Sequence, residues 1–140
     1  MLAVEGRGLP IGLLVTSATP HESKLIEPLL NTIRVPRAGA GRPRTRIKRL
    51  IYDRAADSLK LRRRLLEERN VDLICPHRKN CKHKVQDGRK LRRYGDRWTV
   101  ERTNAWLQNY RRVATRFDRL ISSYSAFVIL ACIMIVLKRL

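Results

Sequence analysis

Residues 94–108 read YGDRWTVERTNAWLQ, and the fold prediction is built outward from them. The stretch has no proline and one glycine, and its apolar residues recur at helical rather than alternating spacing. On a helix of about 100° per residue, a stripe roughly 60° wide carries the polar side chains Tyr94, Arg97, Glu101 and Gln108. This shared face predicts a functional stripe, although Arg97 and Glu101 also fit an ordinary i,i+4 surface ion pair.

The charge of the chain is strongly positive. Lys and Arg number 31 against 12 Asp and Glu in 140 residues, which gives a formal net charge of +19. A chain of this length is expected to form one domain. A folded domain this basic is expected to bind a polyanion, most commonly DNA or RNA, with a ribosomal-type role or an anionic membrane surface as alternatives.

The cysteines indicate a reducing compartment. Three of them, with no evident secretory signal, do not make a disulfide framework, so the cytoplasm is the expected location. Cys75, His77, Cys81 and His83 fall within nine residues and could bind Zn²⁺. The usual zinc signal has two ligand pairs separated by a longer finger, so a strand-end cysteine with loop histidines is the alternative.

The order of predicted elements is hairpin, helix, strand, helix, strand, helix, helix, which indicates a single mixed α/β domain over residues 1–140. In chain order, the predicted segments are a hairpin at 1–18, a helix ending near Ile33, a basic loop at 36–48, a strand at 49–52, a helix at 58–68, a strand at 71–74, a basic loop at 75–93, a helix at 94–112 and an apolar helix at 123–140. The strand–helix–strand unit favours parallel pairing.

The helix starts can be read from their capping residues. Thr19 is predicted to cap the first helix, with Pro20 at its first position and Glu22 at its third. Ser58 is predicted to cap the helix at 58–68, whose inward residues are expected to be Leu59, Leu61, Leu65 and Leu66.

The last helix carries no charge from Tyr124 to Leu137. An apolar run of this length spans about 21 Å, short of the roughly 30 Å hydrocarbon core of a bilayer. We therefore expect a buried helix, packed on the sheet or on another part of the protein, rather than a membrane span.

Asp53 ends the predicted strand at 49–52, immediately before a loop and a helix. In open α/β sheets, ligands bind at the edge where the strands end. Asp53 is therefore a candidate metal ligand. The alternative is that Asp53 or Asp57 only caps the following helix.

These motifs resemble those of DDE transposases of the bacterial insertion-sequence type, in the ribonuclease-H-like superfamily. That family carries a tyrosine, an arginine three residues on, a glutamate four further and a lysine seven further. Residues 94–108 match this spacing, with Gln108 at the lysine position. The family's second catalytic aspartate begins a phrase of the form Asp-basic-small-Tyr-Asp-Ser, and residues 53–58 match it except that Ala56 replaces the tyrosine.

The resemblance implies metal-dependent DNA cleavage and strand transfer at transposon ends. Asp53 and Glu101 would be catalytic residues that hold Mg²⁺, with Mn²⁺ as an alternative. The implied DNA contacts are Tyr94, Arg97, Gln108, Arg111 and Arg112.

The resemblance also implies partners and a location. The partners are transposon-end and target DNA, a homodimer assembled on DNA and an upstream reading-frame product, without a membrane. The implied location is the cytoplasm, in association with the nucleoid. Backbone contact with DNA is expected from the basic stretches 42–49, 62–64, 79–84 and 89–93, which could otherwise be solvated faces.

The implied fold is a partial ribonuclease-H-like α/β fold, a mixed sheet with flanking helices whose first catalytic strand is missing. In the family, the first aspartate lies on a strand before the hairpin, and Glu5 in the hairpin turn does not occupy that position. We therefore expect the chain alone to be the inactive C-terminal part of a transposase. The alternative is a non-catalytic, basic DNA-binding remnant.

Overall fold

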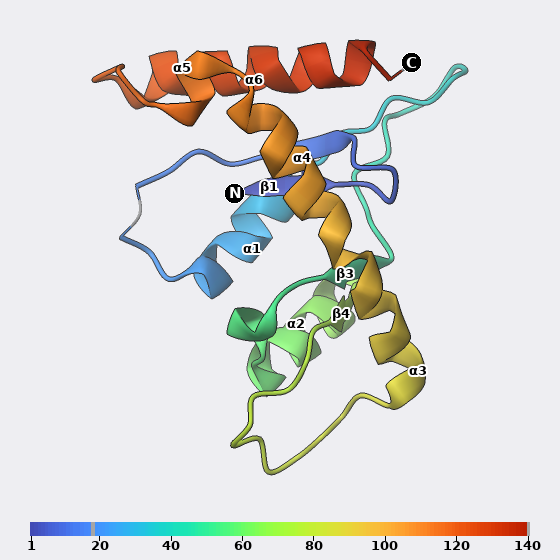
Figure 1. Ribbon diagram of the computed structural model, residues 1–140. Coiled ribbons are helices and arrows are strands. Elements are labelled where there is room, and N and C mark those ends of the chain that lie inside the picture. The colour runs from blue at the N-terminus through green and yellow to red at the C-terminus, as the bar shows by residue number, and fades with distance from the viewer. Residues whose placement is uncertain (18, 140) are drawn as a thin grey trace.

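The computed structural model describes residues 1–17 and 19–139 (Figure 1). The last residue of the predicted hairpin, Ala18, and the last residue of the predicted apolar helix, Leu140, lie outside this part. The elements are β1 (Leu2–Val4), β2 (Pro10–Leu13), α1 (Glu22–Asn31), β3 (Arg49–Ile51), the 3₁₀ turn η1 (Arg54–Ala56), α2 (Leu59–Arg69), β4 (Asp72–Ile74), α3 (Gly88–Leu91), the 3₁₀ segment η2 (Arg92–Arg97), α4 (Trp98–Gln108), α5 (Arg111–Ala114) and α6 (Ile121–Leu137).

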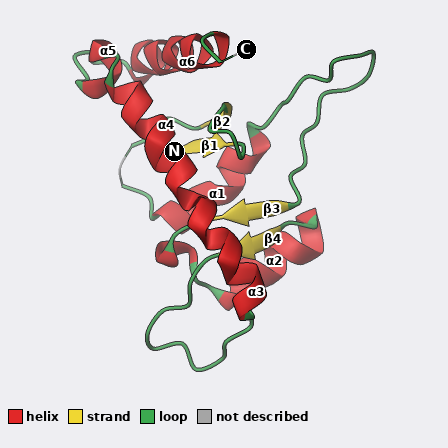
Figure 2. Ribbon diagram, turned by 45° about the vertical axis from the view of Figure 1, so that its right-hand side comes forward, coloured by secondary structure: helices red, strands yellow, loops and turns green. Residues whose placement is uncertain are grey.

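The named strands form two separate two-stranded sheets, not the single mixed sheet that the sequence predicted. β1 pairs antiparallel with β2, with Leu2 opposite Leu13, which confirms the predicted hairpin. β3 pairs parallel with β4, with Leu50 opposite Leu73. The parallel strand–helix–strand unit is therefore confirmed, and Figure 2 shows α2 beside this pair of strands. The α/β class is also confirmed.

The main core lies between α1, α2 and the β3–β4 sheet. Its members are apolar and almost inaccessible to solvent: Ile26, Leu30, Ile33, Ala56, Leu61, Leu65, Val71, Leu73 and Cys75. Side chains of β1, including Ala3, pack against it. Burial of this apolar surface supplies the main driving force for folding at this end of the molecule.

A second, smaller cluster joins α4 to α6 and is formed by Leu107, Ala131 and Ile135. Leu2 packs against this cluster, whereas its neighbour Ala3 packs against the main core. Successive side chains of a strand point to opposite faces, so β1 separates the two clusters and contributes to both.

α6 is buried along one stripe only, made by Val128, Ala131 and Ile135. Phe127, Cys132 and Val136 are half-buried, and six other large apolar residues are exposed in this chain: Ile121, Ile129, Leu130, Ile133, Met134 and Leu137. The expected burial on the sheet or on another part of the protein is therefore partial: among the described residues, α6 packs against β2, α4 and α5 at one end of the molecule (Figure 1). Among the described residues, none of the helices combines the length and apolarity that a bilayer span requires.

The start of α1 differs from the prediction. His21, not Thr19, caps the helix, and its Nδ1 accepts a hydrogen bond from the Ser23 amide at 3.3 Å. The helix therefore begins at Glu22, and Pro20 lies before it. The ring nitrogen of His21 therefore accepts the hydrogen bond from the first turn of the helix that the Thr19 hydroxyl was predicted to accept.

α2 confirms its predicted cap and, through the buried Leu61 and Leu65, half of its predicted inward face. Ser58 accepts a hydrogen bond from the Leu61 amide. Leu59 and Leu66 are exposed, whereas Arg62 is buried beside Leu61 and Leu65. The guanidinium of Arg62 is hydrogen-bonded inside the protein, so Arg62 does not provide the DNA contact that was predicted for the basic stretch 62–64.

The predicted helix at 94–112 is divided. η2 and α4 follow one another directly, and then Tyr110, with φ −94° and ψ 107°, breaks the helix before α5. The buried face of α4 is formed by Thr99, Thr103 and Leu107 at i, i+4 and i+8. This spacing places one helix face against the protein and leaves the opposite face to solvent.

The hairpin turn fastens α4 to the sheet. The Thr103 hydroxyl is fully buried and donates to the Gly8 carbonyl at 2.7 Å. Arg102 Nη2 donates to the Arg7 carbonyl, also at 2.7 Å. Gly8 has φ +90°, and a β-carbon there would lie 3.0 Å from Thr103 Oγ1. A glycine is therefore required where the turn meets α4.

We expect Gly8→Ala to lower the free energy of unfolding by about 2 kcal/mol, because it combines a left-handed backbone with a crowded β-carbon. Gly6→Ala is the matched control, since a β-carbon at Gly6 meets nothing within 4 Å. Urea denaturation of both variants measures the difference. Equal midpoints for the two variants would contradict the role given to Gly8.

Candidate functional site

Asp53 lies just beyond the end of β3 and begins the turn η1. Its Oδ1 accepts a hydrogen bond from the Ala55 amide at 2.8 Å, and the residue is half-buried. Asp53 therefore caps the 3₁₀ turn η1, whereas Ser58 caps the following helix α2. Because this bond uses only Oδ1, it leaves Oδ2 of the same carboxylate to meet another ligand.

Glu101 lies in the first turn of α4, and its side chain is 58% exposed. Arg97 Nη2 donates to Glu101 Oε1 in an i,i+4 ion pair. The Arg97 guanidinium also lies 5.9 Å from the centre of the Tyr94 ring. Arg97 thus contacts both Tyr94 and Glu101, so three of the four residues of the predicted stripe lie together where η2 meets α4.

The two candidate carboxylates lie on neighbouring elements. β3, which precedes Asp53, lies beside η2, which leads into the turn that carries Glu101 (Figure 1). The hydrogen bonds and ion pairs recorded for each carboxylate are local, to Ala55 and to Arg97 respectively. Convergence of Asp53 and Glu101 on shared metal ions remains a prediction.

The remaining predicted DNA contacts lie near the end of α4 and in α5. Gln108 ends α4 and is exposed, and Arg111 begins α5 and is also exposed. Arg112 Nη1 lies 3.8 Å from Asp118 Oδ1, and its guanidinium lies 5.3 Å from the Phe127 ring centre. Arg112 therefore helps to hold α5 against α6 and is less free to move than Arg111.

A polar cluster, which we call the Asp57 node, consists of the buried side chains of Asp57, Arg62 and His77 and the backbone amide of the exposed Arg78. Asp57 Oδ1 accepts from Arg62 Nη2 at 3.0 Å and from His77 Nδ1 at 3.0 Å. Asp57 Oδ2 accepts from the Arg78 amide at 2.6 Å. Arg62 in addition donates to the carbonyl oxygens of Leu73 and Cys75, each at 2.8 Å.

Hydrogen bonding holds Asp57 in its charged form. Burial alone would raise the pKa of its carboxyl group, but the bonds from the Arg78 amide and the Arg62 guanidinium, together with His77, outweigh burial and lower this pKa. Burial also raises the pKa of the Cys75 thiol to about 11, against the opposing charge of Arg62. Cys75 is therefore an unreactive thiol at neutral pH.

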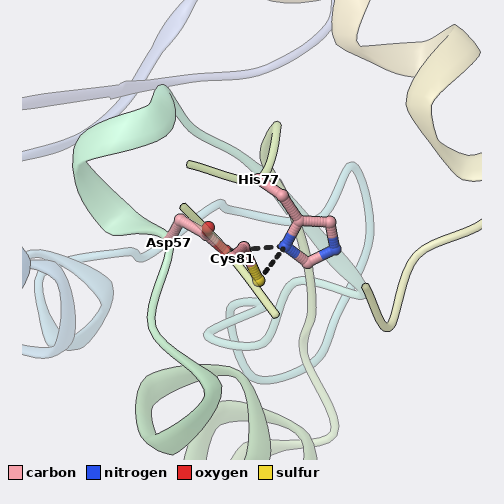
Figure 3. Close-up of side chains that lie close together, drawn as sticks. All are labelled: Asp57, His77 and Cys81. Carbon is pink, nitrogen blue, oxygen red and sulfur yellow. Dashed lines mark hydrogen bonds and ion pairs between the residues drawn. The ribbon is translucent and has the colours of Figure 1, made fainter. Parts of the chain in front are cut away.

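Asp57, His77 and Cys81 bring a carboxylate, an imidazole and a thiol within 4.8 Å of one another (Figure 3). The Val85 amide donates to His77 Nε2 at 3.2 Å. The proton of a neutral imidazole is therefore assigned to Nδ1, which faces Asp57. A cation at Nδ1 would have to displace this proton beside the charge of Arg62.

The zinc set considered from sequence is not assembled as a unit. Cys75 is fully buried, and its Sγ accepts from Arg62 Nη2 at 3.0 Å. Asp57 takes its place beside His77 and Cys81. Imidazole and thiol are not donors that Mg²⁺ prefers. The hydrogen bonds instead make this cluster a structural node that ties the loop at 75–93 to η1 and α2.

Sequence reasoning treated Asp57 only as a possible cap and Arg62 only as part of a basic stretch. One signal was present: Arg62 lies on α2 next to Leu61 and in phase with Leu65, where the helical period predicts an apolar side chain. A charged residue at such a position indicates a buried partner. The identity of that partner depends on tertiary folding, because His77 is 20 residues from Asp57 along the chain.

The sequence matches the family model described as Transposase DDE domain over residues 1–137. It is also 31% identical over 134 residues to a protein of Burkholderia cepacia that is named as a transposase for insertion sequence element IS402. The aligned region covers 96% of this chain and 60% of that relative, so the chain spans about three-fifths of the relative's length. No solved structure gives a significant match.

We expect Asp57→Asn to lower the free energy of unfolding by about 3–5 kcal/mol, because it leaves the buried Arg62 charge without its anionic partner. The two side chains are only 5% and 9% exposed. The matched control is Glu27→Gln, which removes the more exposed partner of Arg64 and should cost at most about 1 kcal/mol. Chemical denaturation measures both, and equal losses would contradict the importance of the node.

The lowered pKa of Asp57 also predicts a pH dependence. The pKa of Asp57 is lowered in the folded protein, whereas the unfolded chain has the ordinary value of about 3.9. The unfolded state therefore takes up this proton first, so the stabilisation is complete above about pH 5 and is lost as the pH falls through the folded-state pKa. We expect the stability difference between wild type and Asp57→Asn to shrink as the pH falls below about 5 and through the folded-state pKa of Asp57. A difference independent of pH would contradict this assignment.

Proposed function

The chain belongs to the transposase DDE domain family, and on this premise we propose that it is the C-terminal part of an insertion-sequence transposase that cleaves and transfers DNA in a metal-dependent reaction. The observation that carries the proposal is the contact of Arg97 with both Tyr94 and the exposed Glu101. These side chains lie where η2 meets α4, with Glu101 on the exposed face of α4, at the spacing that resembles the family motif.

We assign Asp53 and Glu101 as the carboxylates that hold Mg²⁺, or Mn²⁺ in its place. Their donor atoms fit, because hard divalent cations prefer carboxylate oxygens. Asp53 has an oxygen beyond the one that caps η1, and the carboxylate of Glu101 is exposed to solvent. When bound, two such ions stabilise the attacking and leaving oxygens of an in-line phosphoryl displacement.

Transposon-end and target DNA are the proposed substrates. The net charge of +19 supports backbone binding. Tyr94 and Arg97 would contact the strand nearest Glu101, and Gln108 and Arg111 would contact the backbone farther along. Gln108 can donate a hydrogen bond to a phosphate but lacks the fixed charge of a lysine, so its contact would be the weaker one.

We further propose a ribonuclease-H-like arrangement completed by a strand from outside this sequence. Within the described residues, β1 pairs only with β2, and β3 pairs only with β4. β1 lies against α4, and β3 lies against η2, so both sheets face the same continuous helical segment. A strand between β1 and β3 would join the two sheets and bring a third carboxylate next to Asp53.

The chain alone would then bind DNA without cutting it. The competing proposal is a DNA-binding remnant that has lost catalysis altogether. The DNA upstream of the codon for Met1 distinguishes the two. A frame that encodes an aspartate at a strand end supports the transposase, and the absence of such a frame supports the remnant.

In a transposase that joins this chain to its upstream segment, we expect Glu101→Gln and Asp53→Asn each to reduce Mg²⁺-dependent cleavage. The loss should exceed the roughly 10–100-fold that follows removal of an outer-shell partner of a metal ligand. Glu68→Gln, an exposed acid on α2, is the control and should cleave as wild type does. A nicking assay on transposon-end DNA measures all three.

Both active-site variants should keep wild-type thermal stability, because Glu101 is exposed and its pair with Arg97 contributes little. Full cleavage by Glu101→Gln would rule out its role as a metal ligand. Loss of cleavage together with loss of folding would remove the support that this experiment gives to the assignment.

A further inference from the structure

Part of the loop that joins α1 to β3, residues 36–46, projects from the molecule, and we call it the basic arm (Figures 1 and 2). Every residue of the basic arm is exposed to solvent. Val35 and Ile47, the residues on either side of it, are half-buried and pack against the main core. The basic arm therefore leaves and re-enters the domain at two packed residues.

The base of the arm is paired, but its tip is not. The Val35 amide donates to the Arg44 carbonyl at 2.9 Å, and the Arg44 amide donates to the Val35 carbonyl at 2.8 Å. Pro36 and Pro43, the next residues toward the tip, lack the N–H groups that would extend this pairing. The tip at 36–43 therefore does not continue as a two-stranded ribbon.

Arginine is the only polar residue type at the tip. Between the two prolines the sequence reads RAGAGR, so four small residues separate Arg37 from Arg42. Gly41 has φ +146°, a region that favours glycine, and Arg37 Cδ lies 3.7 Å from where a β-carbon of Gly41 would be. Arg37 thus crosses the tip beside the residue that precedes Arg42, which brings two arginine side chains to the end of the arm.

Acidic residues do not balance these charges. The sequence has no Asp or Glu between Glu27 and Asp53. Among the described residues, none of the ion pairs includes Arg37, Arg42 or Arg44. So much like charge on a narrow projection attracts a polyanion.

The shape and chemistry of the tip favour the minor groove of DNA over the major groove. The major groove, about 12 Å wide, admits a helix or a two-stranded ribbon, whereas the minor groove is only about 6 Å wide. The tip is neither a helix nor a ribbon, and it lacks the amide and carboxylate side chains that read adenine and cytosine in the major groove. Arginine is attracted into the minor groove of A·T-rich DNA, because the groove is narrow there and its negative potential is enhanced.

We propose that the basic arm binds the minor groove of A·T-rich duplex DNA, with Arg42 inserted into the groove and Arg44 and Arg46 on the flanking phosphates. This inference rests on the proposed function and adds a contact with duplex DNA beyond the candidate catalytic residues. Arg44 is nine residues before Asp53, a separation of at most about 32 Å. The base of the arm therefore lies within about one turn of duplex, roughly 34 Å, of the proposed cleavage site.

The test uses three duplexes of equal length and backbone charge that differ only in about six central base pairs, which are A·T, G·C or I·C. Inosine lacks the N2 amino group of guanine, so an I·C pair resembles A·T in the minor groove and G·C in the major groove. Fluorescence anisotropy measures the affinity of the whole chain for each duplex. The variants are Arg42→Gln and the matched control Arg63→Gln, which removes the same charge from an exposed position on α2.

We expect the wild-type chain to bind the A·T and I·C duplexes at least about fivefold more tightly than the G·C duplex, a factor at the lower end of the effect of one mismatched base pair. Arg42→Gln should remove most of this preference. Arg63→Gln should weaken all three complexes by the same factor and keep the preference, because a phosphate contact carries no sequence information.

Equal wild-type affinity for the three duplexes would overturn the minor-groove assignment and leave the proposed DNA role standing. An I·C duplex that binds as the G·C duplex does would also overturn it, because the readout would then lie in the major groove. A preference that Arg42→Gln retains, or that Arg63→Gln loses equally, would not belong to the arm and would overturn the proposal. Absence of salt-dependent binding of all three duplexes by the wild-type chain would overturn the proposed function itself.

Discussion

The buried hydrogen bond from Thr103 to the Gly8 carbonyl determines how α4 is rotated on the rest of the molecule. Residues of a helix advance by about 100° each, so once Thr103 points inward, Glu101 points about 160° away from it, toward solvent. Gly8 makes this contact because its left-handed backbone brings the carbonyl against the helix without a β-carbon between them. Exposure of the candidate catalytic face is thus a consequence of how the opposite face is held.

A second constraint acts on the other candidate carboxylate. Asp53 begins the turn η1 and Asp57 ends it, so the bonds that Asp57 makes with Arg62 and His77 also fix the backbone on which Asp53 stands. In a chain with a net charge of +19, the Asp57 carboxylate stabilises the fold by neutralising the buried Arg62 guanidinium. The other donors of this guanidinium are satisfied by the carbonyl oxygens of Leu73 in β4 and of Cys75 just after it. The Asp57 node is therefore a structural support for the edge of the β3–β4 sheet.

The parts of the fold that follow from local pattern were predictable, and those that depend on distant partners were not. The hairpin, the Ser58 cap and the parallel β3–β4 pair follow from turn residues, capping chemistry and chain order. The burial of Arg62 was missed because hydrophobic periodicity identifies the inward face of a helix but does not reveal which backbone carbonyls of other elements lie opposite that face. For the site, spacing correctly grouped Tyr94, Arg97 and Glu101 on one face, whereas the joint use of Asp53 and Glu101 depends on a sheet that these residues alone do not close.

The Arg97–Glu101 pair connects the local structure to the proposed chemistry. Both side chains are partly exposed, so the pair contributes at most about 1 kcal/mol and opens at little cost. Under the proposed function, a DNA phosphate would become the partner of Arg97 and a divalent cation the partner of Glu101, so each charge would exchange one partner for another. A buried pair such as Asp57–Arg62 could not do this, because separating it leaves an uncompensated charge inside the protein. Arg97–Glu101 and Asp57–Arg62 are both arginine–carboxylate pairs, but they differ in exposure. The exposed pair can exchange its partners for ligands, whereas the buried pair stabilises the fold.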